Sequence, residues 1–166
     1  SSRVIVQAGS TLDLSMLGIS AGAGQSTPTI NNLNGAGTIV LSSAGLIAAY
    51  SSPETISGSI QGSGQLTKTG SATLTLSGAN NSYTGGTSIT GGTLTAGAIN
   101  TLPSTGVISL TTSGATLNLG ANQTIGNLAG ATGALVTLGN STLTLGDGSS
   151  QTYAGTISGM GNLVLQ

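Results

Sequence analysis

Two short segments of this 166-residue chain decide its fold, Thr73-Leu74-Thr75-Leu76 and Thr116-Leu117-Asn118-Leu119. In each segment leucine alternates with a small polar residue, and a period of two places the leucines on one face of an extended chain. Threonine is β-branched and favours the pleated conformation, which suits the opposite face. The segments therefore predict strands that are buried on one side. The same alternation recurs in residues 11–14, 38–41, 93–96, 107–110, 142–145 and 162–165.

The intervals between these segments indicate turns. They are rich in glycine, asparagine and serine, residues that tolerate positive φ and tight bends. No stretch keeps apolar residues at positions i, i+3, i+4 and i+7 free of glycine for three helical turns. The sequence therefore predicts an all-β protein.

A glycine box with the pattern apolar-x-Gly-x-Gly-x-apolar occurs three times, at residues 33–39, 60–66 and 157–163. A fourth copy with one inserted residue runs from Leu128 to Leu135. Neighbouring boxes begin at residues 33 and 60, or 128 and 157, which is 27 or 29 residues apart. A unit of this length cannot bury its own apolar face, whereas stacked units bury it, as in a solenoid. The boxes therefore predict a parallel β-helix, and about 17 candidate strands at three per coil predict six or seven coils.

This architecture assigns roles to two groups of residues. An inward ladder of apolar side chains is expected from Leu74, Leu76, Leu94, Leu117, Leu119, Leu143 and Leu145. The glycines of the three regular boxes should lie at turns, with at least one positive φ in each box: Gly35, Gly37, Gly62, Gly64, Gly159 and Gly161.

The composition excludes several functional classes. The chain has two basic and three acidic residues, and it has no cysteine and no histidine. No disulfide, no zinc site of cysteine and histidine, and no Ser-His-Asp arrangement can therefore form. Two basic residues cannot neutralise a nucleic-acid backbone. We expect no catalytic, cofactor-binding or metal-binding residue, and no enzyme.

The few residues that could carry chemistry have simpler interpretations. Asp147 lies in an Asp-Gly turn and supplies one acidic group, whereas calcium loops need several. Asp13 and Glu54 could act as paired carboxylates on a glycoside, but no basic cluster accompanies them. A polysaccharide-active β-helix enzyme is thus the weakest alternative. Tyr83 and Tyr153 each precede a glycine and an apolar strand, which predicts equivalent, corner-filling positions.

A longer motif begins at Gly64-Gln65-Leu66-Thr67-Lys68-Thr69-Gly70, continues through Ser82-Tyr83-Thr84-Gly85-Gly86-Thr87 and ends at Gly91-Gly92-Thr93-Leu94. These residues, within 60–97, resemble the passenger-associated repeat of bacterial autotransporters. The resemblance implies a right-handed parallel β-helix that a C-terminal membrane barrel displays outside a Gram-negative cell. We expect residues 1–166 to be a single β-helix segment of a longer passenger domain, without that barrel and without the secretion signal.

The resemblance also implies a function. The segment is expected to be the stalk of an extracellular adhesin or self-associating antigen at the bacterial surface, exported across the outer membrane and active in adhesion, aggregation or biofilm formation. Its partners would be host or bacterial surface components, or a second copy of itself.

A second hypothesis is an ice-binding β-helix, because Thr73-Leu74-Thr75, Thr93-Leu94-Thr95 and Thr142-Leu143-Thr144 present outward Thr-x-Thr pairs. Ice binding would need these pairs in register on one face. Residues 38–40, 108–110 and 117–119 are expected to interrupt such a ladder.

Overall fold

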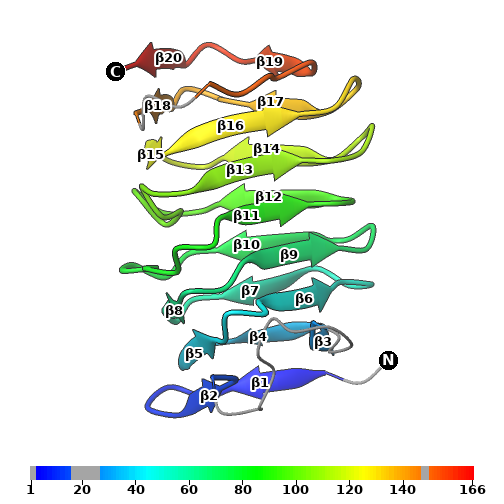
Figure 1. The fold of residues 1–166 in the computed structure, drawn as a ribbon, viewed down its shortest axis with the longest axis vertical. Helices are drawn as coiled ribbons and strands as arrows, with labels where there is room; N and C mark the ends of the chain where they lie inside the picture. Colours follow the sequence, from blue (N-terminus) through cyan, green and yellow to red (C-terminus); the bar gives the residue numbers. More distant parts are fainter. Residues whose placement is uncertain (1–2, 16–26, 147–149) are drawn as a thin grey trace.

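The computed structural model describes residues 3–15, 27–146 and 150–166, which form a column of stacked β-strands (Figure 1). All strand pairs in these residues are parallel, and the chain winds upward as a right-handed coil. The described residues contain no helix, and therefore none that could cross a membrane. The prediction of an all-β parallel solenoid is confirmed.

Three walls enclose the core. The first, called the long sheet, has one strand from each coil and so records about seven complete turns. Its strands, in spatial order, are β1 (Val4–Val6), β4 (Leu33–Gly35), β7 (Glu54–Ile56), β10 (Thr73–Leu76), β12 (Thr93–Ala96), β14 (Thr116–Leu119), β17 (Leu135–Thr137) and β19 (Thr156–Ser158).

The second wall is a six-stranded sheet and the third is split into two three-stranded sheets. The six-stranded sheet contains β3 (Thr29–Asn31), β6 (Leu46–Ala49), β9 (Leu66–Thr69), β11 (Thr87–Ile89), β13 (Val107–Leu110) and β16 (Asn127–Gly130). The split wall contains β2 (Thr11–Asp13), β5 (Thr38–Leu41) and β8 (Ile60–Gly62), and then β15 (Gln123–Ile125), β18 (Thr142–Leu145) and β20 (Asn162–Leu165).

The core is a set of side-chain columns, because the parallel register repeats the same inward position in every coil. Leu74 pairs with Leu94, Leu94 with Leu117 and Leu117 with Val136, and all four side chains are buried. Leu76 and Leu119 are buried in the neighbouring column, where Ala96 lies between them. On the split wall, Leu143 is buried and Leu145 is partly buried against the core.

The glycine boxes do not mark the coil repeat, which corrects the spacing argument. Leu94 pairs with Leu117 and Leu117 with Val136, so these coils are 23 and 19 residues long rather than 27 or 29. The four boxes lie at three different corners. Those at 33 and 157 join the long sheet to the split wall, the one at 60 joins β8 to β9, and the one at 128 joins β16 to β17.

The two glycines of a box are needed for different reasons: the first has a positive φ, and the second lies too close to the neighbouring coil for a side chain. Gly62 has a φ of 107°, and an added Cβ would lie 2.2 Å from the carbonyl oxygen of Leu41. Gly64 has no positive φ, but an added Cβ would lie 2.0 Å from the carbonyl oxygen of Ser42. The same division holds in the other two regular boxes, where Gly35 and Gly159 have positive φ and Gly37 and Gly161 do not.

The split in the third wall has a side-chain explanation. Between β8 and β15, two coils have no strand on this wall, and buried amides supply hydrogen bonds there instead. Asn81 accepts a hydrogen bond from the backbone N–H of Ile60 in the coil below and donates one to the carbonyl of Thr101 above. Gln123 accepts from the N–H of Leu102 and donates to the carbonyl of Ala98.

Candidate functional site

The outward side of the long sheet, here called the threonine face, carries two columns of polar side chains in register. Thr73 pairs with Thr93, and Thr93 with Thr116, so three threonines stand one above another. A second column lies two residues further along each strand. It contains Thr55, Thr75, Thr95, Asn118, Thr137 and Ser158.

The threonine face is a flat array of hydroxyl and methyl groups. Neighbouring strands of a sheet are about 4.8 Å apart, and residues i and i+2 on a strand are roughly 6.6 Å apart. Thr73, Thr75, Thr93 and Thr95 are partly exposed, and no hydrogen bond among the described residues involves their hydroxyls. These groups are therefore free to bind water or a ligand.

The predicted interruptions of the threonine ladder are largely wrong. Residues 38–40 belong to β5 and residues 108–110 to β13, so both lie on other walls. Asn118 does lie on the face, where it takes the place of a threonine and keeps the column polar. The interruption that sequence reasoning missed is Leu135, which is 41% exposed between Thr116 and Thr156. Thr142 and Thr144 lie on the split wall and add nothing to this face.

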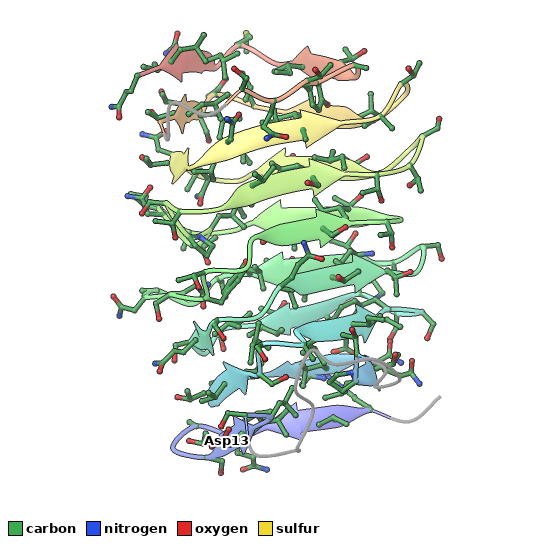
Figure 2. The ribbon with its side chains drawn as sticks, in the orientation of Figure 1. Asp13 is labelled. Carbon is green, nitrogen blue, oxygen red and sulfur yellow. The ribbon has the colours of Figure 1, made fainter. Side chains whose placement is uncertain are left out.

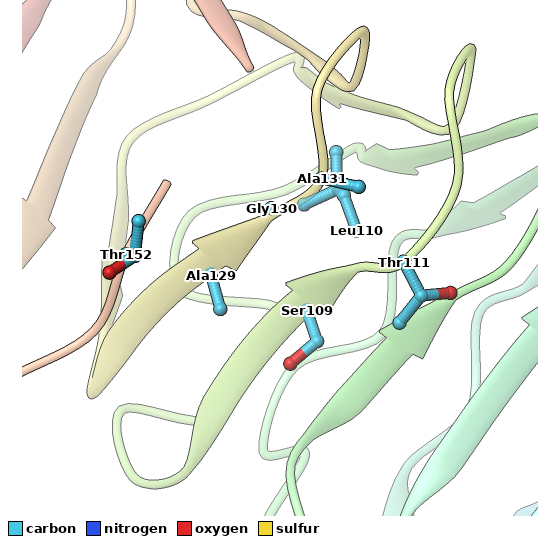
Figure 3. A pocket seen from close by; sticks show the side chains of 7 residues that line it. All are labelled: Ser109, Leu110, Thr111, Ala129, Gly130, Ala131 and Thr152. Atoms are coloured by element: carbon cyan, nitrogen blue, oxygen red, sulfur yellow. The ribbon is translucent and has the colours of Figure 1, made fainter. Parts of the chain in front are cut away.

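Two shallow depressions lie on the six-stranded sheet. One of about 370 Å³ is lined by residues of β13 and β16, by the residue after each of these strands and by Thr152 of the next coil (Figure 3): Ser109, Leu110, Thr111, Ala129, Gly130, Ala131 and Thr152. Another of about 300 Å³ is lined by Asn31, Ala49, Tyr50, Ser51 and Gly70. In neither of these two depressions does a hydroxyl side chain lie beside a basic side chain that could activate it.

The structure places the two candidate carboxylates apart. Glu54 lies in the long sheet in register with Leu74, and its buried side chain accepts a hydrogen bond of 2.9 Å from Arg3. Asp13 lies at the end of β2 near the base of the column (Figure 2), where hydrogen bonds from the side chain and backbone of Ser15 lower the pKa of its carboxyl group. Within residues 3–15, 27–146 and 150–166, no three acidic side chains gather as a metal site. Asp147 is outside these residues.

The three tyrosines occupy different environments, so the expected equivalence of Tyr83 and Tyr153 is wrong. Tyr83 is fully buried before a strand of the six-stranded sheet, and its hydroxyl lies 2.6 Å from Thr87 Oγ1. Tyr153 forms a bridge with Gly130 and precedes a strand of the long sheet. Tyr50 is buried and donates a hydrogen bond to the carbonyl of Leu33. Burial raises the pKa of all three phenols.

Lys68 is a functional candidate that the sequence argument did not single out. Its side chain is fully buried on the inner side of β9, although lysine is among the residues least often found inside. The ammonium donates hydrogen bonds to the carbonyl oxygens of Gly70 and Gly91 at 2.8 Å each, and to that of Thr69 at 3.3 Å. The period of two could have located it, because Lys68 follows the inward Leu66 by two residues.

The buried ammonium predicts a pH dependence of stability. Burial lowers the pKa of Lys68 from its usual 10.5 to about 8. Between these values the unfolded chain holds a proton that the folded protein has released, so the free energy of unfolding should rise with pH, by at most about 1.4 kcal/mol per pH unit. Urea titrations at several pH values should show this rise in the wild type and not in Lys68→Met. An equal pH dependence in both proteins would contradict the assignment.

The fold and the face together define a class, a repetitive parallel β-solenoid whose long sheet carries uncharged polar columns. Residues 66–96 match the family model described as the passenger-associated-transport-repeat. The chain is also 36% identical over 115 residues to the "Adhesin BmaC autotransporter" of Brucella suis biovar 1 (strain 1330), an alignment that covers 66% of this chain and 3% of that protein. No solved structure gives a significant match. The chain therefore carries an autotransporter passenger repeat.

Proposed function

We propose that the solenoid is a non-enzymatic stalk of a surface-displayed autotransporter adhesin, with binding distributed over the threonine face. The observation that carries this proposal is the register of Thr73, Thr93 and Thr116 and of the parallel column through Thr75 and Thr95. An array that repeats the same hydroxyls coil after coil can engage a repetitive surface at many points, and weak contacts then add through multivalency. Residues 1–166 would be one β-helix segment of a longer passenger domain.

The partners proposed for this face are host or bacterial cell-surface components. The name of the Brucella suis relative, an adhesin, supports this class of partner. The face also lacks charged side chains in the described residues, so polar contacts rather than ion pairs would provide the binding. Such contacts depend little on ionic strength. The proposed location is the outside of the cell, after export across the outer membrane.

We expect lysines on the threonine face to weaken adhesion strongly while the fold persists. The double variant Thr75→Lys/Thr95→Lys places two ammonium groups on adjacent coils and holds a ligand away from the flat array. Binding of the purified protein to host cells, matrix proteins and immobilised copies of itself should fall at least about tenfold, which corresponds to about 1.4 kcal/mol.

The matched control for this experiment is Thr67→Lys/Ser109→Lys. Thr67 and Ser109 are both partly exposed in the six-stranded sheet and lie two coils apart, each paired with Ser88. Loss of binding in the control pair alone would move the adhesive surface to the six-stranded sheet. Unchanged binding in both pairs would contradict a distributed site on either wall.

Homotypic association is a further expected result for the 166-residue polypeptide. In the coil formed by β19 and β20, Leu163, Val164 and Leu165 are exposed, and no described strand pairs with the upper edge of either strand. Such an edge recruits another strand. Sedimentation should therefore show assembly that grows with concentration and responds weakly to salt. Leu163→Lys/Leu165→Lys should suppress it. A monomer at high micromolar concentration, unaffected by these substitutions, would refute the idea.

The in-register threonines also favour ice binding as a second candidate, because a flat ladder of Thr-x-Thr pairs is the arrangement that this function requires. Four coils have a hydroxyl or amide group in both columns, and their residues in the first column are Thr73, Thr93, Thr116 and Thr156. The coil between Thr116 and Thr156 has Leu135 in the first column, which interrupts the ladder. Ice-recrystallisation inhibition by the purified protein, abolished in Thr75→Lys/Thr95→Lys, would support this candidate. Its absence would remove it and leave the adhesin proposal intact.

A further inference from the structure

The coils of this solenoid are so alike that strand pairing alone does not determine which coil lies on which. β7 pairs with β10, and β10 pairs with β12. If residues 73–92 were looped out, β7 would meet β12 directly, with Thr55 opposite Thr95 on the outside. The inner positions would be similar too, since Ile56 would meet Ala96 in place of Leu76. The hydrophobic pattern tolerates such a slip of one coil.

Lys68 does not tolerate this slip. In the native register it lies opposite Ile89, and its ammonium reaches across to the carbonyl of Gly91 as well as to those of Thr69 and Gly70. All three protons of the ammonium are therefore engaged. The ammonium also lies 5.8 Å from the centroid of the Tyr50 ring, which is within the range of a cation–π interaction.

The corner above Lys68 has room for the ammonium because Gly92 has no side chain. Gly92 has a φ of 61°, and an added Cβ would lie 2.7 Å from the lysine Nζ. Because Thr93 pairs with Thr116, the slipped register would bring Ala115 to the place of Gly92, at the end of a corner that is two residues longer. A side chain would then occupy the space of the ammonium. The hydrogen bond from the ammonium to the carbonyl of Gly91 in the upper coil would be lost.

We propose that Lys68 is the register key of the solenoid: its buried ammonium is satisfied only when the coil containing Gly91 and Gly92 lies directly above it. A buried charged group without its acceptors costs more than an ordinary lost hydrogen bond, so misregistered states are disfavoured by at least about tenfold. Lys68 thus contributes specificity, in the way that single buried polar residues specify alignment in other repetitive folds.

Disulfide trapping tests the proposal, because the chain has no cysteine of its own. Cysteines at 55 and 75 report the native register, in which Thr55 and Thr75 are paired. Cysteines at 55 and 95 report the slip, since two coil spacings of about 4.8 Å exceed the reach of a disulfide. After refolding, Lys68→Met should form the 55–95 disulfide at least about ten times more often than the parent, and Lys68→Gln should lie between them.

The control is Ile89→Met, an apolar replacement in the same inner column. It should leave the 55–95 disulfide at the level of the parent. Equal trapping in Lys68→Met and the parent would overturn the proposal. Failure of both Lys68 variants to refold would also overturn it, because Lys68 would then be required for folding itself rather than for the choice of register.

Discussion

Leu76→Asp is expected to prevent cooperative folding of the solenoid. Leu76 is fully buried, with Ile56 below it and Ala96 above it in the same column. The substitution removes about 1.5–3 kcal/mol of apolar burial and adds a carboxylate without a partner. The two described cations cannot supply one, since Arg3 pairs with Glu54 and the Lys68 ammonium is bound to three carbonyls. The combined loss is comparable with the whole stability of a domain, about 5–15 kcal/mol.

Thr75→Asp is the matched control, because it places the same carboxylate one residue away on the threonine face. Its neighbours Thr55 and Thr95 are uncharged, so the change should cost less than about 1 kcal/mol. Urea unfolding followed by circular dichroism measures both variants. Leu76→Ala, expected to cost about 2–5 kcal/mol, separates the loss of packing from the buried charge. Equal losses for Leu76→Asp and Thr75→Asp would contradict the inward and outward assignment.

Gly62→Val is expected to cause the second largest loss in the free energy of unfolding. The positive φ at Gly62 disfavours any branched side chain, and the added Cβ would fall 2.2 Å from the carbonyl oxygen of Leu41 in the coil below. Backbone strain contributes about 1–3 kcal/mol, and the clash requires the two coils to separate locally. We expect the free energy of unfolding to fall by more than about 3 kcal/mol in urea titrations.

Gly114→Val provides the comparison that isolates the clash. Gly114 also has a positive φ, of 78°, but nothing lies within 4 Å of its added Cβ. The control should therefore show the backbone strain alone, about 1–3 kcal/mol. If both valine variants lost the same stability, the close approach of neighbouring coils at Gly62 would have no energetic consequence, and the account of the box would be wrong.

The inward and outward sides of each strand could be predicted from sequence because the side-chain period of a strand is two. Leu74 and Thr75 occupy the predicted sides, and the same rule applied to Leu66 and Lys68 would have placed the lysine inside. The position of a segment around the perimeter could not be predicted. Residues 38–40 and 73–75 have similar patterns, yet β5 lies on the split wall and β10 on the long sheet.

The sequence by itself determined that this chain is an all-β solenoid, since alternating strands and glycine corners are local properties of short segments. Only the tertiary structure decided which segments stack. The glycine box repeats at three different corners because a corner requires a strained residue and a close approach wherever it lies, so its spacing does not measure a coil. The alignment of Thr75 with Thr95, and of Lys68 beneath Gly91, depends on the length of each intervening loop and on contacts about twenty residues apart in sequence, for which a local pattern contains no signal.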